Sequence, residues 1–176
     1  MIKALAVTQE RASVINKEKQ HFNIVINIQG PSERTPTFNT LKMNRKTLTQ
    51  AVGRIATADG YHFYTAEPRE MAKMINTYPA MWLTPPEFSS MQGRKHGKVV
   101  YTVTLHAMDA GAKLPSEERE SIWARLEQDV VELFSSLSSE EFVVAVENLK
   151  IRHSSHTLTP HGEVAATATA EVVTFF

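Results

Sequence analysis

Alternating apolar and polar residues predict three strands along the chain, over residues 22–28, 99–107 and 164–175. A period of two is typical of a strand that buries one face, because successive side chains point to opposite sides of the strand. The apolar face of the first strand consists of Phe22, Ile24, Ile26 and Ile28, with Asn23 and Asn27 on the other face. The apolar face of the last strand is made largely of alanine: Val164, Ala166, Ala168, Ala170 and Val172.

Helical spacing of apolar residues predicts three helices. Thr47–Ala58 has apolar residues at i, i+3, i+4 and i+7, and Asp59-Gly60 is a usual helix end. A second helix is expected to begin at Pro68, since the first helical turn tolerates proline. The longest helix begins at Ser116, which we expect to be its N-cap, and runs on to Leu137. Its apolar stripe consists of Ile122, Leu126, Val130, Leu133 and Leu137.

Less regular patterns fill the intervals between these elements. Residues 33–44 contain proline, asparagine and several threonines, and they are predicted to be loop, with a short strand at Phe38–Met43 as the alternative. Residues 142–146 fit a short strand or a helical turn equally well. Short strands are predicted over residues 61–65, 78–83 and 148–153.

Together these elements predict an α+β fold: an antiparallel sheet packed on one face by one long helix and shorter helices. The small side chains of the last strand indicate that a helix lies close to the sheet, and the helix from Ser116 is the natural candidate. We expect residues 46–176 to form this domain. Residues 1–45 are expected to be an N-terminal extension, either an added strand or an arm.

Composition excludes several classes of protein. The 176 residues are 42% apolar and include no cysteine, which removes disulfide scaffolds, cysteine-ligated zinc sites and thiol nucleophiles. No apolar run reaches the roughly 18 residues of a membrane span. The apolar run at the start is too short for a secretory signal, so we expect a protein of the cytoplasm. Basic and acidic residues both number 19, which disfavours a strongly basic surface for nucleic acid.

The zero net charge is the sum of two opposite halves. Residues 1–98 have 14 basic and 7 acidic residues, whereas residues 99–176 have 5 basic and 12 acidic residues. This asymmetry could supply complementary patches to a head-to-tail contact between copies of the chain.

The sequence contains few candidates for catalysis. His153, His156 and His161 are close enough in sequence to suggest a zinc site, but their spacing matches no known motif, and a plain hairpin is the favoured interpretation. The paired glutamates at 117–118 and 140–141 each follow a serine and fit helix N-termini better than acid–base catalysis. No nucleophile elbow or glycine-rich phosphate loop is present. We therefore expect no enzymatic activity and no cofactor.

The segment Ser89–Lys98 contains two glycines and is predicted to be an exposed loop. Its side chains Arg94, Lys95, His96 and Lys98 are the candidate interface residues of the chain. No aromatic residues are interleaved with them, so sequence-specific binding of nucleic acid is not expected. A solvated loop and an electrostatic contact with another protein both fit this composition.

From about Thr47 onward, the order of elements resembles that of the tail terminator, or tail completion, proteins of long-tailed bacteriophages and prophages. The first stretches that carry the resemblance are YPAMWLTPP (Tyr78–Pro86) and KVVYTVTLHAMD (Lys98–Asp109), separated by the polar loop. A long helix with RESIWARLEQDVVELFSSL (Arg119–Leu137) follows, and a terminal hairpin ends in GEVAATATAEVVTFF (Gly162–Phe176).

The resemblance implies a small structural protein without an active site, made in the host cytoplasm and assembled into a virion or prophage particle. Such proteins form a ring, a hexamer in that family, that caps the tail tube and presents a surface to the head connector. The implied partners are further copies of the chain, the tail tube protein and head connector proteins. By position, Ser89–Lys98 resembles the loop that faces ring neighbours or the tube.

Two other functions stay open. One is an intracellular module that binds a peptide or small ligand at Tyr78–Trp82. The other is a metal-dependent hydrolase that uses the three histidines.

Overall fold

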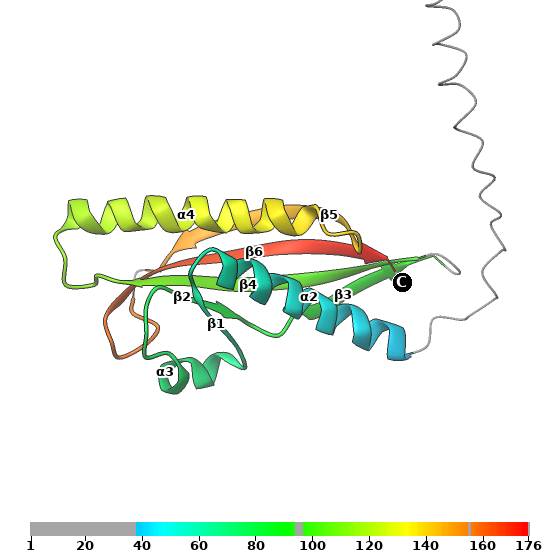
Figure 1. Ribbon diagram of the computed structural model, residues 1–176, viewed down its shortest axis with the longest axis horizontal. Coiled ribbons are helices and arrows are strands. Elements are labelled where there is room, and N and C mark those ends of the chain that lie inside the picture. The colour runs from blue at the N-terminus through cyan, green and yellow to red at the C-terminus, as the bar shows by residue number, and fades with distance from the viewer. Residues whose placement is uncertain (1–37, 94–96, 155, 176) are drawn as a thin grey trace, which may run out of the picture. The chain divides into compact units, whose positions relative to one another are not determined.

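The structure is a computed structural model that describes residues 38–93, 97–154 and 156–175 (Figure 1). All of these residues belong to one unit, which extends over residues 34–176. The strand predicted at Phe22–Ile28 lies outside the described residues. The predicted division of the chain at residue 45 falls within the first described helix, and it stays a prediction.

The described chain has the predicted α+β fold. In chain order its elements are α2 (Phe38–Ala58), β1 (His62–Thr65), a 3-10 turn (Pro68–Glu70), α3 (Met71–Met74), β2 (Ala80–Leu83), β3 (Glu87–Gln92), β4 (Lys98–Ala110), α4 (Ser116–Ser138), β5 (Val143–His153) and β6 (Glu163–Phe175).

The six described strands form a single sheet, five of them in the order β1-β2-β4-β6-β5, with β3 paired to β4 beside β2. The β4 and β6 strands pair along their whole length, and β2 and β3 pair with different parts of the other side of β4. The sheet is mixed rather than antiparallel as predicted, because β1 and β2 are parallel. A parallel pair needs a crossover connection of about a dozen residues, and residues 66–79 with their short helices provide it.

Two long helices cover one face of the sheet, where a single long helix was predicted. The α4 helix lies along β5 and β6 (Figure 1), and its leucines pack on Ala166, Ala168 and Ala170, so the predicted close contact of this helix with the alanine face is confirmed. The α2 helix adds Leu48 and Val52 to the same core.

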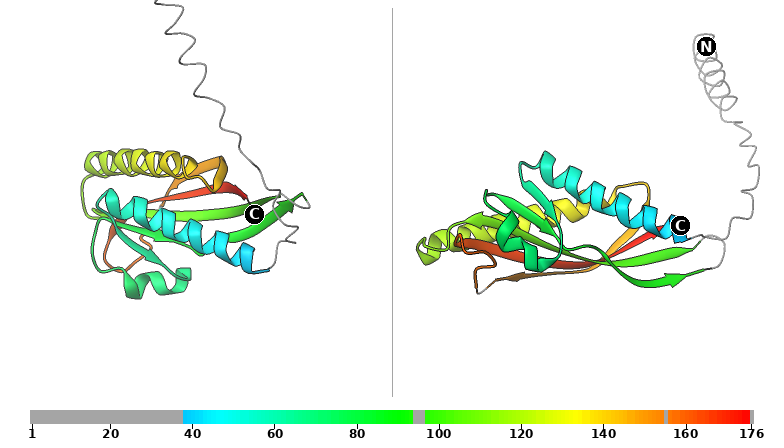
Figure 2. Two further views of the ribbon diagram at one scale, coloured as in Figure 1. Left: turned by 45° about the vertical axis from the view of Figure 1, so that its right-hand side comes forward. Right: turned by 90° about the horizontal axis from the view of Figure 1, so that it is seen from below.

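The loop or strand predicted at Phe38–Met43 is wrong, since α2 already begins at Phe38. Once the buried turns of a helix have formed, each further residue extends it at little cost, even where helix propensity is modest. The amide of Asn44 also donates to the backbone carbonyl of Phe175 and so joins the first part of α2 to the end of β6. Figures 1 and 2 show this end of α2 beside β3 and the C-terminus.

The opposite face of the sheet has a smaller core under α3. Met71 and Ile75 pack there on Trp82 and Met108. Farther along β4 and β6 this face is made of half-buried threonines and His106, and in the described part of the chain no long helix covers it.

Two local predictions are corrected, and the strand alternative for residues 142–146 is confirmed from Val143 onward. Ser116 is the first residue of α4 rather than its N-cap; Pro115 precedes the helix and provides no side-chain cap. Residues 143–146 are strand and belong to β5. The regular backbone of this strand is interrupted at Asn148, which has a φ of 55°. The predicted loop Ser89–Lys98 is strand as far as Gln92, where β3 ends, and strand again from Lys98, the first residue of β4.

Candidate functional site

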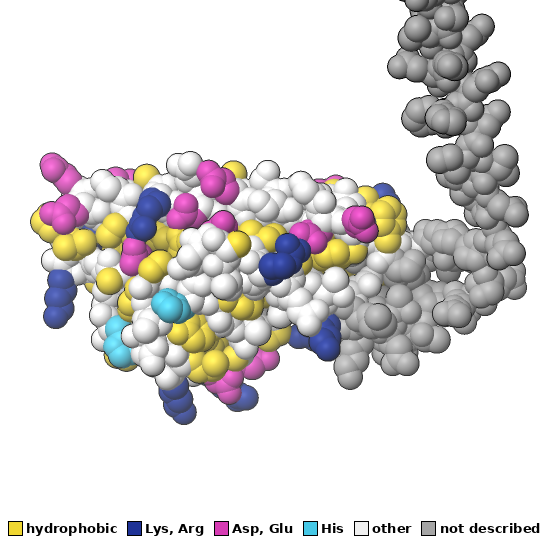
Figure 3. All heavy atoms as spheres, in the orientation of Figure 1, with side chains coloured by type: hydrophobic (Ala, Val, Ile, Leu, Met, Phe, Trp, Pro, Cys, Tyr) yellow, Lys and Arg dark blue, Asp and Glu magenta, His cyan; other side chains and the backbone are white. Residues whose placement is uncertain are grey.

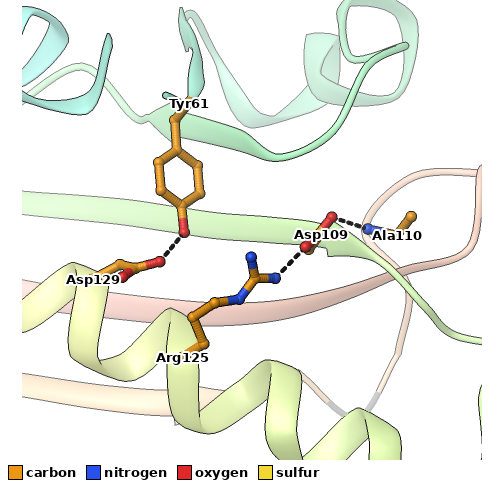
Figure 4. A network of polar contacts seen from close by, with 5 residues as sticks. All are labelled: Tyr61, Asp109, Ala110, Arg125 and Asp129. Carbon is orange, nitrogen blue, oxygen red and sulfur yellow. Dashed lines mark hydrogen bonds and ion pairs between the residues drawn. The ribbon is translucent and has the colours of Figure 1, made fainter. Parts of the chain in front are cut away.

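A polar network fastens α4 to the ends of β1 and β4 (Figure 4). The Tyr61 hydroxyl donates to the Asp129 carboxylate, and Arg125 forms an ion pair with Asp109. Burial, and then the neighbouring carboxylate of Asp129, raises the pKa of the Tyr61 hydroxyl far above its ordinary value. Tyr61 therefore stays protonated at neutral pH and acts as a fixed donor, which suits an anchor better than a catalytic base.

Glu163 is a buried carboxylate, 3% exposed, at the start of β6. Its Oε1 accepts hydrogen bonds from the backbone N–H groups of Leu158 and Thr159. Its Oε2 accepts hydrogen bonds from two hydroxyls, that of Thr159 at 2.6 Å and that of Tyr78 at 3.2 Å. Burial alone would raise the pKa of Glu163, but these hydrogen bonds outweigh it and hold the pKa below its ordinary value. Four donors from the protein thus surround this carboxylate, which ties the β5–β6 connection to the segment before β2.

The structure does not bring the three candidate histidines together as a metal site. His153 lies at the end of β5, where its Nε2 is 2.7 Å from Glu127 of α4 and its ring stacks on Trp123 at 4.8 Å between centroids. His156 and His161 are exposed in the connection to β6. Among the residues described, no three histidine or acidic side chains are grouped so as to hold a metal ion.

The segment Tyr78–Trp82 belongs to the core and offers little surface to a ligand. All residues of β2 are buried, and the Trp82 ring stacks with Tyr64 at 6.3 Å between centroids. On the neighbouring strand, burial lowers the pKa of His106, so this side chain is uncharged at neutral pH, and its Nδ1 lies 2.8 Å from the Thr167 hydroxyl.

An open groove lies instead between α2 and β1, with a volume of about 690 Å³. Phe63 lines it, together with Arg54 from the exposed side of α2. Gly53 lets the two elements approach, because a Cβ atom at this position would lie 2.8 Å from the Phe63 ring. Among the described strands β1 is the last on its side of the sheet, so the groove runs beside an edge with which none of them pairs.

A second edge that no described strand pairs with belongs to β3, and large apolar side chains are exposed along it. Phe88 is 56% exposed and Met91 is 47% exposed. Their partners on β4 are Tyr101 and Val99, which both point into the core beneath the helices. Residues directly opposite each other in a sheet share a face, so Phe88 and Met91 extend the apolar layer of the core outward to an edge that is left open to solvent.

An irregularity in β3 makes this arrangement possible. Residues three apart on a regular strand point to opposite faces, so Phe88 and Met91 would be separated. The register of β3 against β4 shifts between Phe88 and Ser90, which returns Met91 to the face that Phe88 occupies. Sequence analysis missed β3 for this reason: its two apolar residues fit neither the period of a strand nor a helical stripe.

The opposite edge strand of the sheet, β5, is better protected against pairing. Its register against β6 shifts at two places, and Lys150 and Arg152 are exposed along it. Shifts and charged side chains are common means of preventing edge-to-edge association. β3 has no lysine, arginine or proline, and its only charged residue is Glu87 at its first position.

Of the four candidate interface residues, the structure describes Lys98, which lies at the start of the strand that pairs with β3. Lys98 is exposed at the first position of β4, where it pairs with both Gln92 of β3 and Phe175 of β6. Arg94, Lys95 and His96 precede it and lie outside the described residues.

Charge is also unevenly distributed. The residues whose side chains are described, 44–93, 97–154 and 156–175, include 16 acidic and 11 basic residues, while residues 1–43 include 6 basic and 3 acidic residues. Figure 3 shows acidic side chains gathered over α4.

Comparison of the sequence with protein-family models and with curated proteins gave no match. In the part of the chain that the structure describes, no helix has both the length and the apolarity to cross a membrane.

Proposed function

We propose that the chain is a structural protein of a phage or prophage tail, which forms an oligomeric ring that caps the tail tube and joins it to the head. The observation that carries this proposal is the uncovered apolar edge of β3. An exposed pair of large apolar side chains on an unprotected strand edge is a common mark of a surface that pairs with another chain.

Two further features support a structural role. From α2 to β6, the elements follow the order on which the resemblance to tail terminator proteins rests, except that β3 occupies the first part of the expected loop. In addition, each polar cluster described above joins two elements of the fold, and the partners of Tyr61 and Glu163 are side chains and backbone groups of the protein itself. Contacts within the fold explain why these polar side chains lie where they do, so a catalytic role is not needed to explain them.

Light scattering coupled to size-exclusion chromatography tests this proposal, with electron microscopy to display the assembly. We expect the full chain to form a closed ring with a mass of several copies. A mass of one chain at every concentration and salt, together with no binding to purified tail tubes, would contradict it. Genes for portal, capsid and tail-tube proteins on both sides of this gene would support it independently.

A triple variant tests the basic segment beside β3. Replacing Arg94, Lys95 and Lys98 by alanine should reduce the assembled fraction and leave the melting temperature nearly unchanged. The control is a triple alanine variant at the exposed residues Arg69, Lys73 and Lys113, which removes the same charge from other parts of the chain. Equal loss of assembly in both variants would mean that net charge, and not this segment, controls association.

The groove between α2 and β1 favours a second function, the binding of an extended peptide or small ligand. It replaces Tyr78–Trp82 as the place for such a ligand, because β2 is buried whereas the groove is open and lined by Phe63. Replacing Thr57, an exposed residue of α2 that also lines the groove, by tryptophan would fill the groove without placing an atom against the Phe63 ring at Gly53. If binding is the function, this variant should lose its ligand while ring formation is unaffected.

A further inference from the structure

A strand that pairs with the open edge of β3 must have one apolar face and one polar face. A strand added to this edge would continue the sheet, and one of its faces would lie beside Phe88 and Met91. That face should be apolar, since it would extend the core layer. The other face should be polar or small, because the corresponding face of β4 has threonines at Thr102 and Thr104.

One segment of the chain itself has this pattern. Residues 22–28 alternate apolar side chains with Asn23, Val25 and Asn27, and they contain no charged residue and no proline. The described residues offer few comparable candidates, because β4 and β6 are already paired on both sides and β5 carries charges along its edge.

The position at which the described chain begins also points to β3. Asn44 of α2 is hydrogen-bonded to Phe175, Phe175 pairs with Lys98, and Lys98 pairs with Gln92 of β3. The first turns of α2 therefore lie at the end of the sheet where β3 lies (Figure 2).

We propose that residues 22–28 of one copy pair with the open edge of β3 of the next copy. The inference rests on the proposed function, because the ring supplies the second copy. A contact between the segment of one chain and the edge of another is heterologous, so identical contacts can follow one another around a closed ring. Each copy then gives one strand and receives one, and no β3 edge is left open.

Residues 29–37 could span about 30 Å when extended, so chain length alone would also permit pairing within one copy. The charge distribution favours contact of residues 1–43 with the described part of a chain in either arrangement, since residues 1–43 have an excess of basic residues and the described side chains an excess of acidic ones. The experiment must therefore separate the two arrangements.

The absence of cysteine makes disulfide trapping the sharpest test. Three single variants place a cysteine at Ile24, Ile26 or Ile28, and a fourth is Met91→Cys. Each of the first three is mixed with the fourth under mild oxidation, so that a mixed dimer forms only between copies. Opposite residues of paired strands have Cβ atoms about 4.5–5.5 Å apart, close to the separation that a disulfide needs.

We expect at least one of the three mixtures to form the mixed dimer on the order of 100-fold faster than control mixtures, because paired residues have a millimolar effective concentration. Two controls are matched to the variants. Val25→Cys lies on the other face of the same segment, and Val131→Cys is an exposed apolar position of α4, 49% exposed, away from β3.

Three results would overturn the inference: no mixture exceeds the controls, Met91→Cys alone dimerises as fast as the mixtures, or double variants cross-link only within one chain. The second result would mean that β3 pairs with β3 of another copy, and the third that the segment covers its own β3. If the unmodified chain still forms rings, the proposed function survives these failures; if it is monomeric as well, both proposals fall.

A charge variant gives a second measurement that does not depend on oxidation. Replacing Ile24 and Ile26 by lysine should reduce the assembled fraction at least tenfold, because two charges would enter the apolar layer beside Phe88 and Met91. Replacing Asn23 and Asn27 by lysine adds the same charge on the other face and should leave most of the assembly intact. Equal effects of the two double variants would contradict a strand with one buried face.

Discussion

Replacement of Glu163 by glutamine tests how the β5–β6 connection is held. The change keeps the shape of the side chain but turns one carboxylate oxygen into an amide nitrogen, which can only donate. The backbone N–H groups of Leu158 and Thr159 face Oε1 and cannot accept, so the amide oxygen must take that position. The new nitrogen then faces the hydroxyls of Thr159 and Tyr78, which can turn and accept from it.

The expected loss follows from this geometry. The two backbone N–H groups keep their acceptor in E163Q, so the variant should fold. It loses the charge of the acceptor, and the hydroxyls of Thr159 and Tyr78 lose the oxygen to which they donate. Hydrogen bonds to a charged group contribute about 1.5–3 kcal/mol each, against about 1 kcal/mol for neutral pairs. We expect the free energy of unfolding to fall by about 1–2 kcal/mol at neutral pH. Glu163→Ala leaves two buried N–H groups unpaired and should cost about 3–5 kcal/mol.

The stability difference between the unmodified chain and E163Q should depend on pH in a definite direction. The pKa of Glu163 in the folded chain lies below its ordinary value of 4.5. The contribution of the carboxylate to stability is therefore fully present above the unfolded pKa, and it is lost as the pH falls through the folded pKa. The stability difference between the unmodified chain and E163Q should be constant near neutral pH and shrink below about pH 4.5.

Urea denaturation followed by tryptophan fluorescence measures this difference at each pH. Glu147→Gln, an exposed position on β5, is the control and should change stability little at any pH. A difference of zero at neutral pH, or one that grows as the pH falls, would refute the account of Glu163 as a charged acceptor.

Three other substitutions test the core and the anchor of α4 by chemical denaturation. Leu133→Ala removes a fully buried side chain between α4 and the sheet and should cost about 2–5 kcal/mol. Ala168→Leu should also destabilise the chain, by about 1–3 kcal/mol, because α4 lies directly on the alanine face; unchanged stability would mean that this contact is loose. Tyr61→Phe removes the donor to Asp129 and should cost about 1–3 kcal/mol, and a double-mutant cycle with Asp129→Asn should show coupling between the two positions.

The elements that sequence analysis predicted well are those that bury one face over many residues. The α4, β4 and β6 elements have a clear period because one face of each contributes to the larger core over most of its length. β3 was missed because only the register shift between Phe88 and Ser90 places its two apolar residues on one face, and a shift of this kind depends on the partner strand. The start of α2 was missed for a similar reason, since Asn44 is held by Phe175, 131 positions away in sequence.

The polar clusters were beyond sequence analysis for the same physical reason. Glu163 follows a glycine in a predicted turn and looks like any exposed acid in the sequence. Its partner Tyr78 lies 85 positions earlier, and Tyr61 and Asp129 are 68 positions apart. Pairs at such separations are set by the topology of the sheet, which the local pattern does not contain.

The opposite charges of the two halves of the chain take on a more specific meaning in the structure. The acidic excess lies wholly within the described residues, many of its members on α4, while the basic excess lies mostly in residues 1–43 and at Arg94 and Lys95. Such charges attract over roughly a Debye length, about 8 Å at physiological salt, and so affect mainly the rate and orientation of encounter. The contact proposed at β3 is apolar, and burial of Phe88 and Met91 would determine how long it lasts. If the chain assembles as proposed, salt should slow the formation of the ring far more than it dissociates rings already formed.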